Sequence, residues 1–228
     1  MVNYEESIKK PFTDIAKLII GIVLSIVPIV HWIAKGFILE CSGFGKTKPS
    51  KKMPEWKDWG YLFIKGLASD IILLIYAIPA IVVFLLGAGI AIGSLAQNAF
   101  ISPGFMGQGP EVISQLISQN WYLALPTLMQ VAPIMILGFI LFLIATYFTP
   151  LAVLNYLNTK KFGEAFNFSK ITKKAFTGNY FINWLIVVVI TAIVTLILSI
   201  IPWVGTQIAF FITGVIGYSI YGQVLRKA

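Results

Sequence analysis

Three ionisable residues stand among apolar ones in this chain, namely Asp70, Lys35 and His31. Asp70 lies about one turn inside the start of a long uncharged stretch, and His31 and Lys35 are four residues apart, so they share a helix face. An acid surrounded by hydrocarbon is costly and by default suggests a proton or cation site. The alternative, which we favour, is that Asp70 lies at the inner interface of a membrane and pairs with Lys65 or Lys35.

Other catalytic chemistry finds little support in the sequence. His31 is the only histidine and Cys41 the only cysteine, whereas a zinc site needs three or four protein ligands. The chain contains neither a Gly-x-Ser-x-Gly nor a P-loop pattern. We therefore predict no catalytic residue, no metal, no cofactor and no enzymatic activity.

The elements that must position these residues are long apolar stretches. The chain is 58% hydrophobic and 11% charged, far from the roughly 25% charge of soluble domains. Four uncharged stretches each reach about 30 Å as helices, enough to cross a bilayer in which only helices satisfy the backbone of a single segment. They cover residues 71–92, 131–154, 181–201 and 206–225. We predict an all-α integral membrane protein with four full transmembrane helices, in one polytopic membrane domain over residues 1–228.

A fifth apolar stretch, residues 18–34, is short and interrupted by Pro28. It is either a single crossing or a proline-broken helical hairpin, re-entrant or crossing twice over a short distance. A weak internal repeat favours the hairpin, because Ser25-Ile26-Val27-Pro28-Ile29-Val30 matches Ser199-Ile200-Ile201-Pro202-Trp203-Val204. The two copies cover about 4–45 and 162–225, and such repeats are common in membrane folds.

The basic residues are confined to particular connections. All seventeen Lys and Arg lie within 9–65 or 160–227, so the net charge of +8 is arranged as juxtamembrane charge rather than as a nucleic-acid surface. With the hairpin, all of them fall on one side of the cell membrane. We predict that both termini and the loops 42–65 and 160–178 are cytoplasmic and that the loop 97–120 is outside.

Two of these basic segments carry aromatic residues suited to the headgroup region. Trp56 and Trp59 lie among charges just before a span, and Trp prefers this depth. Residues 160–177 combine phenylalanines with lysines, as in an amphipathic helix on the inner leaflet. The candidate residues at the lipid interface are Trp56, Trp59, Lys161, Lys170, Lys173 and Lys174.

The opening of the chain resembles an archaeal family of multi-pass membrane proteins known as domain of unknown function 4013. The resemblance rests on Asn3-Tyr4-x-Glu6-Ser7, on Ser25-x-x-Pro28 and above all on Pro54-Glu55-Trp56-x-Asp58-Trp59-Gly60. It covers most of the chain and implies a multi-pass membrane fold. It implies no catalytic role.

Two functional hypotheses follow. The first is a non-enzymatic scaffold or lipid-interacting, membrane-organising module whose partners are membrane lipids, itself or other membrane proteins, and no nucleic acid. The second is a small transporter or permease subunit with Asp70 and Lys35 near its pathway. A polar cavity that reaches the middle of the membrane would distinguish the second from the first.

Overall fold

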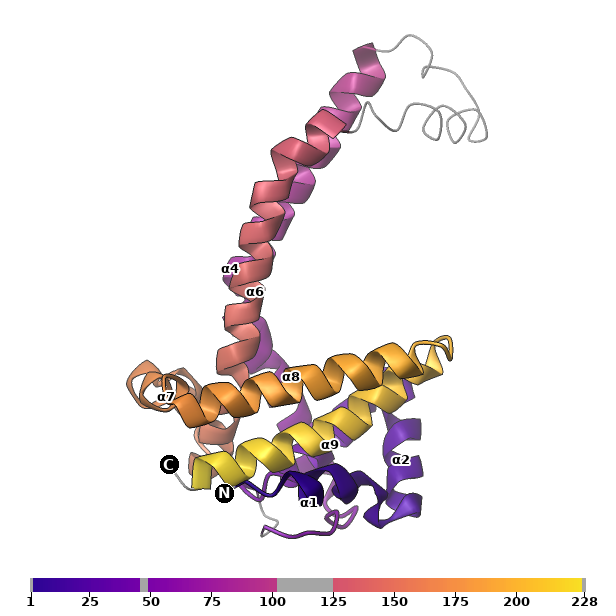
Figure 1. The fold of residues 1–228 in the computed structure, drawn as a ribbon, viewed down its shortest axis with the longest axis vertical. Helices are drawn as coiled ribbons and strands as arrows, with labels where there is room; N and C mark the ends of the chain where they lie inside the picture. Colours follow the sequence, from indigo (N-terminus) through magenta and orange to yellow (C-terminus); the bar gives the residue numbers. More distant parts are fainter. Residues whose placement is uncertain (1, 46–48, 102–124, 227–228) are drawn as a thin grey trace. The chain divides into compact units, whose positions relative to one another are not determined.

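The computed structural model describes residues 2–45, 49–101 and 125–226, and these residues form helices without a strand (Figure 1). The shorter helices are α1 (Tyr4–Lys9), η1 (Lys10–Thr13), α2 (Ile15–Ile26), α3 (His31–Glu40), η3 (Phe162–Phe166) and α7 (Phe168–Ala175). The long helices are α4 (Trp59–Ile101), α6 (Leu125–Thr159), α8 (Gly178–Leu198) and α9 (Val204–Arg226).

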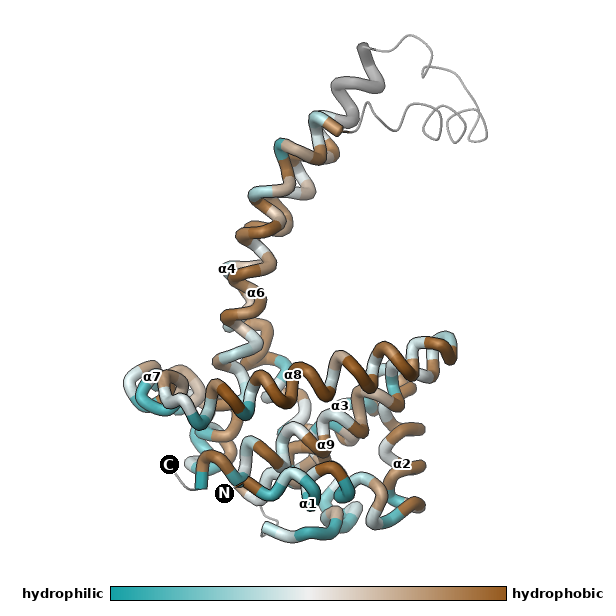
Figure 2. Tube along the Cα trace, in the orientation of Figure 1, coloured by the Kyte–Doolittle hydropathy of each residue, from teal (hydrophilic) through white to brown (hydrophobic). Residues whose placement is uncertain are grey.

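The four long helices are each long and apolar enough to cross a membrane, which confirms the predicted fold class. Figure 2 shows hydrophobic residues along most of α4, α6 and α8, and hydrophilic ones in α1 and α7. Helix α4 begins twelve residues before the predicted span because Lys65 and Asp70 are paired with residues of α3. It also continues to Ile101, into the segment predicted as the loop 97–120; the remainder of that loop lies outside the described residues.

Side-chain caps explain where several helices begin. A polar side chain just before the helix accepts a hydrogen bond from a backbone N–H of the first turn, which would otherwise lack a partner. The capping residues are Asn3 for α1, Asp14 for α2, Asn167 for α7 and Thr177 for α8.

The chain breaks at Pro28 between α2 and α3, and again at Pro202 between α8 and α9. In both turns the backbone N–H two residues after the proline donates to the carbonyl oxygen of that proline, at 2.8 and 2.7 Å. The residue between them, Ile29 or Trp203, has a positive φ of 70° or 64°. The two turns therefore share their geometry, while the wider repeat and the membrane position of the α2–α3 pair stay predictions.

The described residues divide into two compact units, one formed by residues up to Leu74 and from Tyr147 onward, the other by Ile75–Thr146. In the first unit α9 is the central helix and contacts α1, α2, α3 and α8. Phe37, Leu62, Phe211 and Val215 belong to its buried apolar core. The N-terminal segment is held against this core by a hydrogen bond from Tyr4 Oη to Asn183 Oδ1 of α8 (3.0 Å).

The second unit consists of the later part of α4 packed against the earlier part of α6. Glycines allow the two helices to approach: a Cβ atom on Gly138 would lie 2.8 Å from the ring of Phe84. Ser94 Oγ donates to Thr127 Oγ1 at 2.9 Å. Large apolar side chains such as Leu85 and Met129 are exposed on this unit, as expected for surfaces that face lipid.

Candidate functional site

The predicted polar residues meet where α3 crosses the first turns of α4. Gly36 and Gly66 make this crossing close, since a Cβ atom on Gly36 would overlap the carbonyl oxygen of Leu62, and one on Gly66 that of Trp32. Close approach through glycine is a common way to pack membrane helices. It brings side chains on either side of the crossing within bonding distance.

Asp70 lies at one side of this crossing, and its carboxylate has three neighbours on α3. Lys35 forms an ion pair with Oδ1, and Trp32 Nε1 donates to Oδ2 at 2.8 Å. His31 Nε2 lies 3.5 Å from Oδ2. The structure thus brings together all three residues singled out in the sequence, and Asp70 takes Lys35 rather than Lys65 as its partner.

A second ion pair lies on the other side of the crossing, between Glu40 of α3 and Lys65 of α4. Both side chains are about 5% exposed, so the two charges compensate one another in a site with little access to water. In this pair α3 supplies the acid and α4 the base, whereas in the first pair α3 supplies the base and α4 the acid. The two pairs together therefore fix the direction and register of α3 against α4.

Trp32 was missed in the sequence, although it stands three residues before Lys35 and so on the same helix face. Its indole ring also contacts Phe63 edge-on, with ring centroids 5.4 Å apart. An indole that both packs and donates a hydrogen bond orients the Asp70 carboxylate. Helical spacing was the signal that would have included it.

This arrangement joins α3 to α4 through an ion pair and a hydrogen bond. The Asp70 carboxylate contacts the Lys35 ammonium and the indole N–H of Trp32. Across the described parts of the chain, no three His, Cys, Asp or Glu side chains lie close enough to bind one metal ion. The geometry is that of a helix–helix junction.

The predicted interface residues fall into two groups. Trp59 begins α4 and is exposed, whereas Trp56 is stacked on Phe37 with ring centroids 3.9 Å apart. The Trp56 Nε1 atom is buried, and the described residues provide it with no hydrogen-bond partner. Trp56 thus packs against the core of the first unit, and its position in a membrane stays a prediction.

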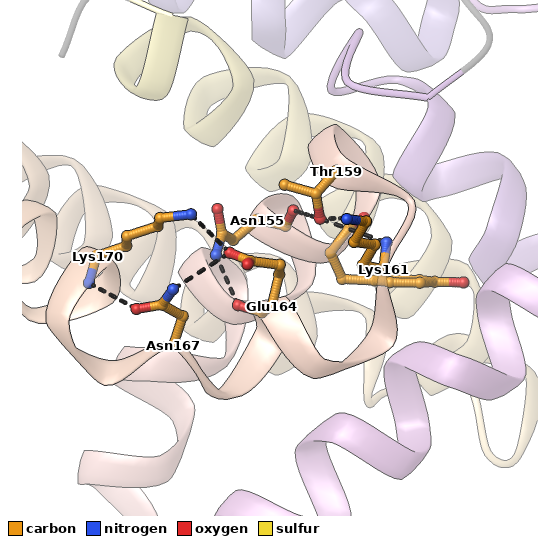
Figure 3. A network of polar contacts seen from close by, with 7 residues as sticks. Asn155, Thr159, Lys161, Glu164, Asn167 and Lys170 are labelled. Carbon is orange, nitrogen blue, oxygen red and sulfur yellow. Dashed lines mark hydrogen bonds and ion pairs between the residues drawn. The ribbon is translucent and has the colours of Figure 1, made fainter.

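The lysines lie on and around α7. Figure 3 shows how the segment before α7 is tied to the end of α6: Asn155 Nδ2 donates to the backbone carbonyl of Glu164 at 2.6 Å, and Lys170 pairs with the Glu164 carboxylate at 2.9 Å. The Lys170 ion pair lowers the pKa of Glu164. Lys161 and Lys173 are exposed, and Lys174 is partly so.

Helix α7 is amphipathic in an unusual way. Ile171 and Ala175 are buried, yet Phe168 and Phe176 are 60% and 79% exposed. The helix therefore presents aromatic side chains next to its lysines rather than a purely polar outer face. Such a surface suits the boundary between headgroups and acyl chains.

Comparison with known proteins places the chain in a family. A family model described as "Protein of unknown function (DUF4013)" matches residues 19–203. No curated protein and no solved structure matches the chain. Because the match covers more than half of the 228 residues, the chain belongs to the DUF4013 family of proteins of unknown function.

Proposed function

We propose that this protein is a non-enzymatic, membrane-organising module that binds anionic lipids of the cell membrane. The observation that carries the proposal is α7 with its C-cap residue, where exposed Phe168 and Phe176 flank the segment that carries Lys170, Lys173 and Lys174. Phenylalanine gains by entering the acyl boundary, and lysine gains about 1 kcal/mol beside an anionic surface. Its partners are membrane lipids, copies of itself or other membrane proteins.

The junction of α3 and α4 supports this function over transport. A transporter that used Asp70 would need this carboxylate available to a moving ion or proton. Its contacts with Lys35 and Trp32 instead serve to join two helices. Asp70 and Lys35 are therefore structural in this proposal.

Lipid binding is tested on the detergent-solubilised protein by native mass spectrometry, with phosphatidylglycerol and phosphatidylcholine as competing probes. We expect preferential retention of phosphatidylglycerol, reduced several-fold by the double substitution Lys173→Gln and Lys174→Gln. The matched control is Lys52→Gln with Lys57→Gln, which removes the same charge from exposed positions elsewhere. If both double variants lose phosphatidylglycerol retention equally, or if the wild type does not prefer phosphatidylglycerol to phosphatidylcholine, α7 is excluded as a lipid-binding element.

The proposal places both termini and the loops 42–65 and 160–178 in the cytoplasm, with the loop 97–120 outside. Single cysteines at Glu5, Ser114 and Ser169, in a Cys41→Ser background, test it with an impermeant maleimide on intact cells. We expect labelling at position 114 alone. Labelling at positions 5 or 169 would overturn this orientation.

A further inference from the structure

A hollow of about 230 Å³ opens in the first unit where its N-terminal segment, the loop after α3 and the end of α9 meet. It is smaller than the ~300–1,000 Å³ of sites for drug-sized ligands, which suits a small group. Most of the residues that line it are polar or charged. They include Glu6, Lys10, Lys51, Gln223 and Arg226.

Within the described residues, two cations on this wall donate hydrogen bonds to neutral groups. Lys10 is 5% exposed, and its Nζ donates to the carbonyl oxygen of Cys41 at 2.9 Å. Arg226 Nη1 donates to the carbonyl oxygen of Ser42 at 2.7 Å. Among the described residues no carboxylate lies within ion-pair distance of either cation. A buried ammonium without a carboxylate in direct contact is costly, so an anion in the hollow would stabilise it.

The rest of the wall is held in place by bonds between the two ends of the chain. The backbone N–H of Asn3 donates to Gln223 Oε1 at 2.7 Å, and Gln223 Nε2 donates to Ser7 Oγ at 3.0 Å. Ser219 Oγ donates to the same Cys41 carbonyl as Lys10, at 3.4 Å. The hollow is therefore formed before any ligand arrives, which reduces the entropic cost of binding.

The charge of the hollow favours an anion. Three cations line it, Lys10, Lys51 and Arg226, against the single carboxylate of Glu6. Glu6 Oε2 already accepts a hydrogen bond from Asn3 Nδ2 at 3.3 Å. Both Lys10 and Arg226 retain N–H donors beyond the one bonded to a carbonyl.

We propose that this hollow binds a phosphate group, held by Lys10 and Arg226 with Lys51 at its rim. Phosphate presents several oxygens to such donors, and a guanidinium matches it in a bidentate manner. The inference rests on the proposed function in that an anionic lipid would bring the phosphate; a soluble phosphate would satisfy the same donors. Burial lowers the pKa of Lys10, and a bound anion would raise it again.

The test uses the full-length protein in a nonionic detergent, titrated separately with inorganic phosphate, phosphatidylglycerol and phosphatidylcholine. Binding is followed by thermal shift and by native mass spectrometry. We expect Arg226→Gln to weaken binding of the phosphate-bearing probe about tenfold or more, as for one lost charged hydrogen bond. Lys51→Gln should weaken it a few-fold, while its neighbour Lys52, which does not line the hollow, serves as the matched control.

Lys10→Gln should weaken phosphate binding most, but it also removes a buried hydrogen bond to the Cys41 carbonyl. If this variant fails to fold, Arg226→Gln and Lys51→Gln test the site. Weakening by these two and not by Lys52→Gln supports the site, and the probe that loses affinity identifies the source of the phosphate. Unchanged binding in both, or no binding of either phosphate-bearing probe by the wild type, would overturn it. A phosphatidylglycerol preference that depends on Lys173 and Lys174 alone would retain the proposed function without this site.

Discussion

Substituting Gly66 by alanine tests the central claim that α3 and α4 meet at a close glycine crossing. The new Cβ atom would overlap the carbonyl oxygen of Trp32 and lie 2.9 Å from the Trp32 Cα. Carbon atoms prefer a separation of about 3.5–4.0 Å. Since the obstruction is backbone, no side-chain rotation relieves it, and α3 and α4 must move apart.

The expected cost follows from this geometry. Overpacking in a close-packed region costs about 1–3 kcal/mol, and separation of the helices also weakens the ion pairs on both sides of the crossing. Against this, alanine favours a helix over glycine by about 0.5–1 kcal/mol. We expect Gly66→Ala to destabilise the protein by about 1–3 kcal/mol. Gly60→Ala is the control, because the added Cβ atom meets nothing within 4 Å there, and it should be neutral or slightly stabilising.

Unfolding in mixed micelles of increasing SDS content, followed by circular dichroism, measures the difference between the two variants. A second readout separates the crossing from a purely local clash. If Gly66→Ala separates the helices, Asp70→Asn should cost less in that background than in the wild type, because its pairing with Lys35 is already weakened. Equal stability of Gly66→Ala and Gly60→Ala would refute the close crossing.

Three further predictions concern single side chains. Asp70→Asn should destabilise the protein by about 1–2 kcal/mol in the same SDS assay, since Lys35 loses its counter-charge in a partly exposed site. Adding Lys35→Met should recover part of the lost stability. A double variant less stable than Asp70→Asn would contradict the pairing. Trp56→Phe should change stability by less than about 1 kcal/mol, because the stacking on Phe37 remains and the described residues offer the buried N–H no hydrogen-bond partner. Trp56→Ala should cost about 3 kcal/mol, because it removes the stacked ring. Burial raises the pKa of the Cys41 thiol to about 12, so the thiol should stay protonated at pH 8. We therefore expect it to react with maleimide only after unfolding in SDS. Rapid labelling of the folded protein would contradict this burial.

The four membrane-spanning helices could be predicted because each is a local property of the sequence. Twenty or more uncharged residues force a helix in hydrocarbon whatever else surrounds them. The ends of the helices depend on tertiary contacts as well as on local sequence. Lys65 and Asp70 suggested that a span begins after them, yet α4 continues through both because α3 supplies their partners.

The partners themselves depend on contacts that no local pattern encodes. Asp70 was expected to pair with Lys65 or Lys35, and the choice follows from the direction in which α3 crosses α4. The hollow at Lys10 and Arg226 joins residues more than two hundred positions apart, held by the bond between Asn3 and Gln223. Nothing in the spacing of these residues indicated that Lys10 would be buried.

The turn at Pro28 leads to a prediction about the N-terminal pair of helices. It has the same hydrogen bonds and the same positive φ as the turn at Pro202, so the short matching sequence specifies the turn in both places. The helices that flank it differ: α8 has 21 residues, whereas α2 has 12, a rise of about 18 Å against the ~30 Å of the hydrocarbon core.

This length favours a re-entrant pair over two full crossings. With the native thiol removed by Cys41→Ser, a cysteine at Trp203 should react with an impermeant maleimide added outside intact cells, and a cysteine at Ile29 should not. Both positions are exposed in the turn, so local burial does not explain a difference between them. If position 29 reacts as readily as position 203, the N-terminal pair reaches the outer surface despite its length, and the bilayer must thin around it or the pair must extend to meet it.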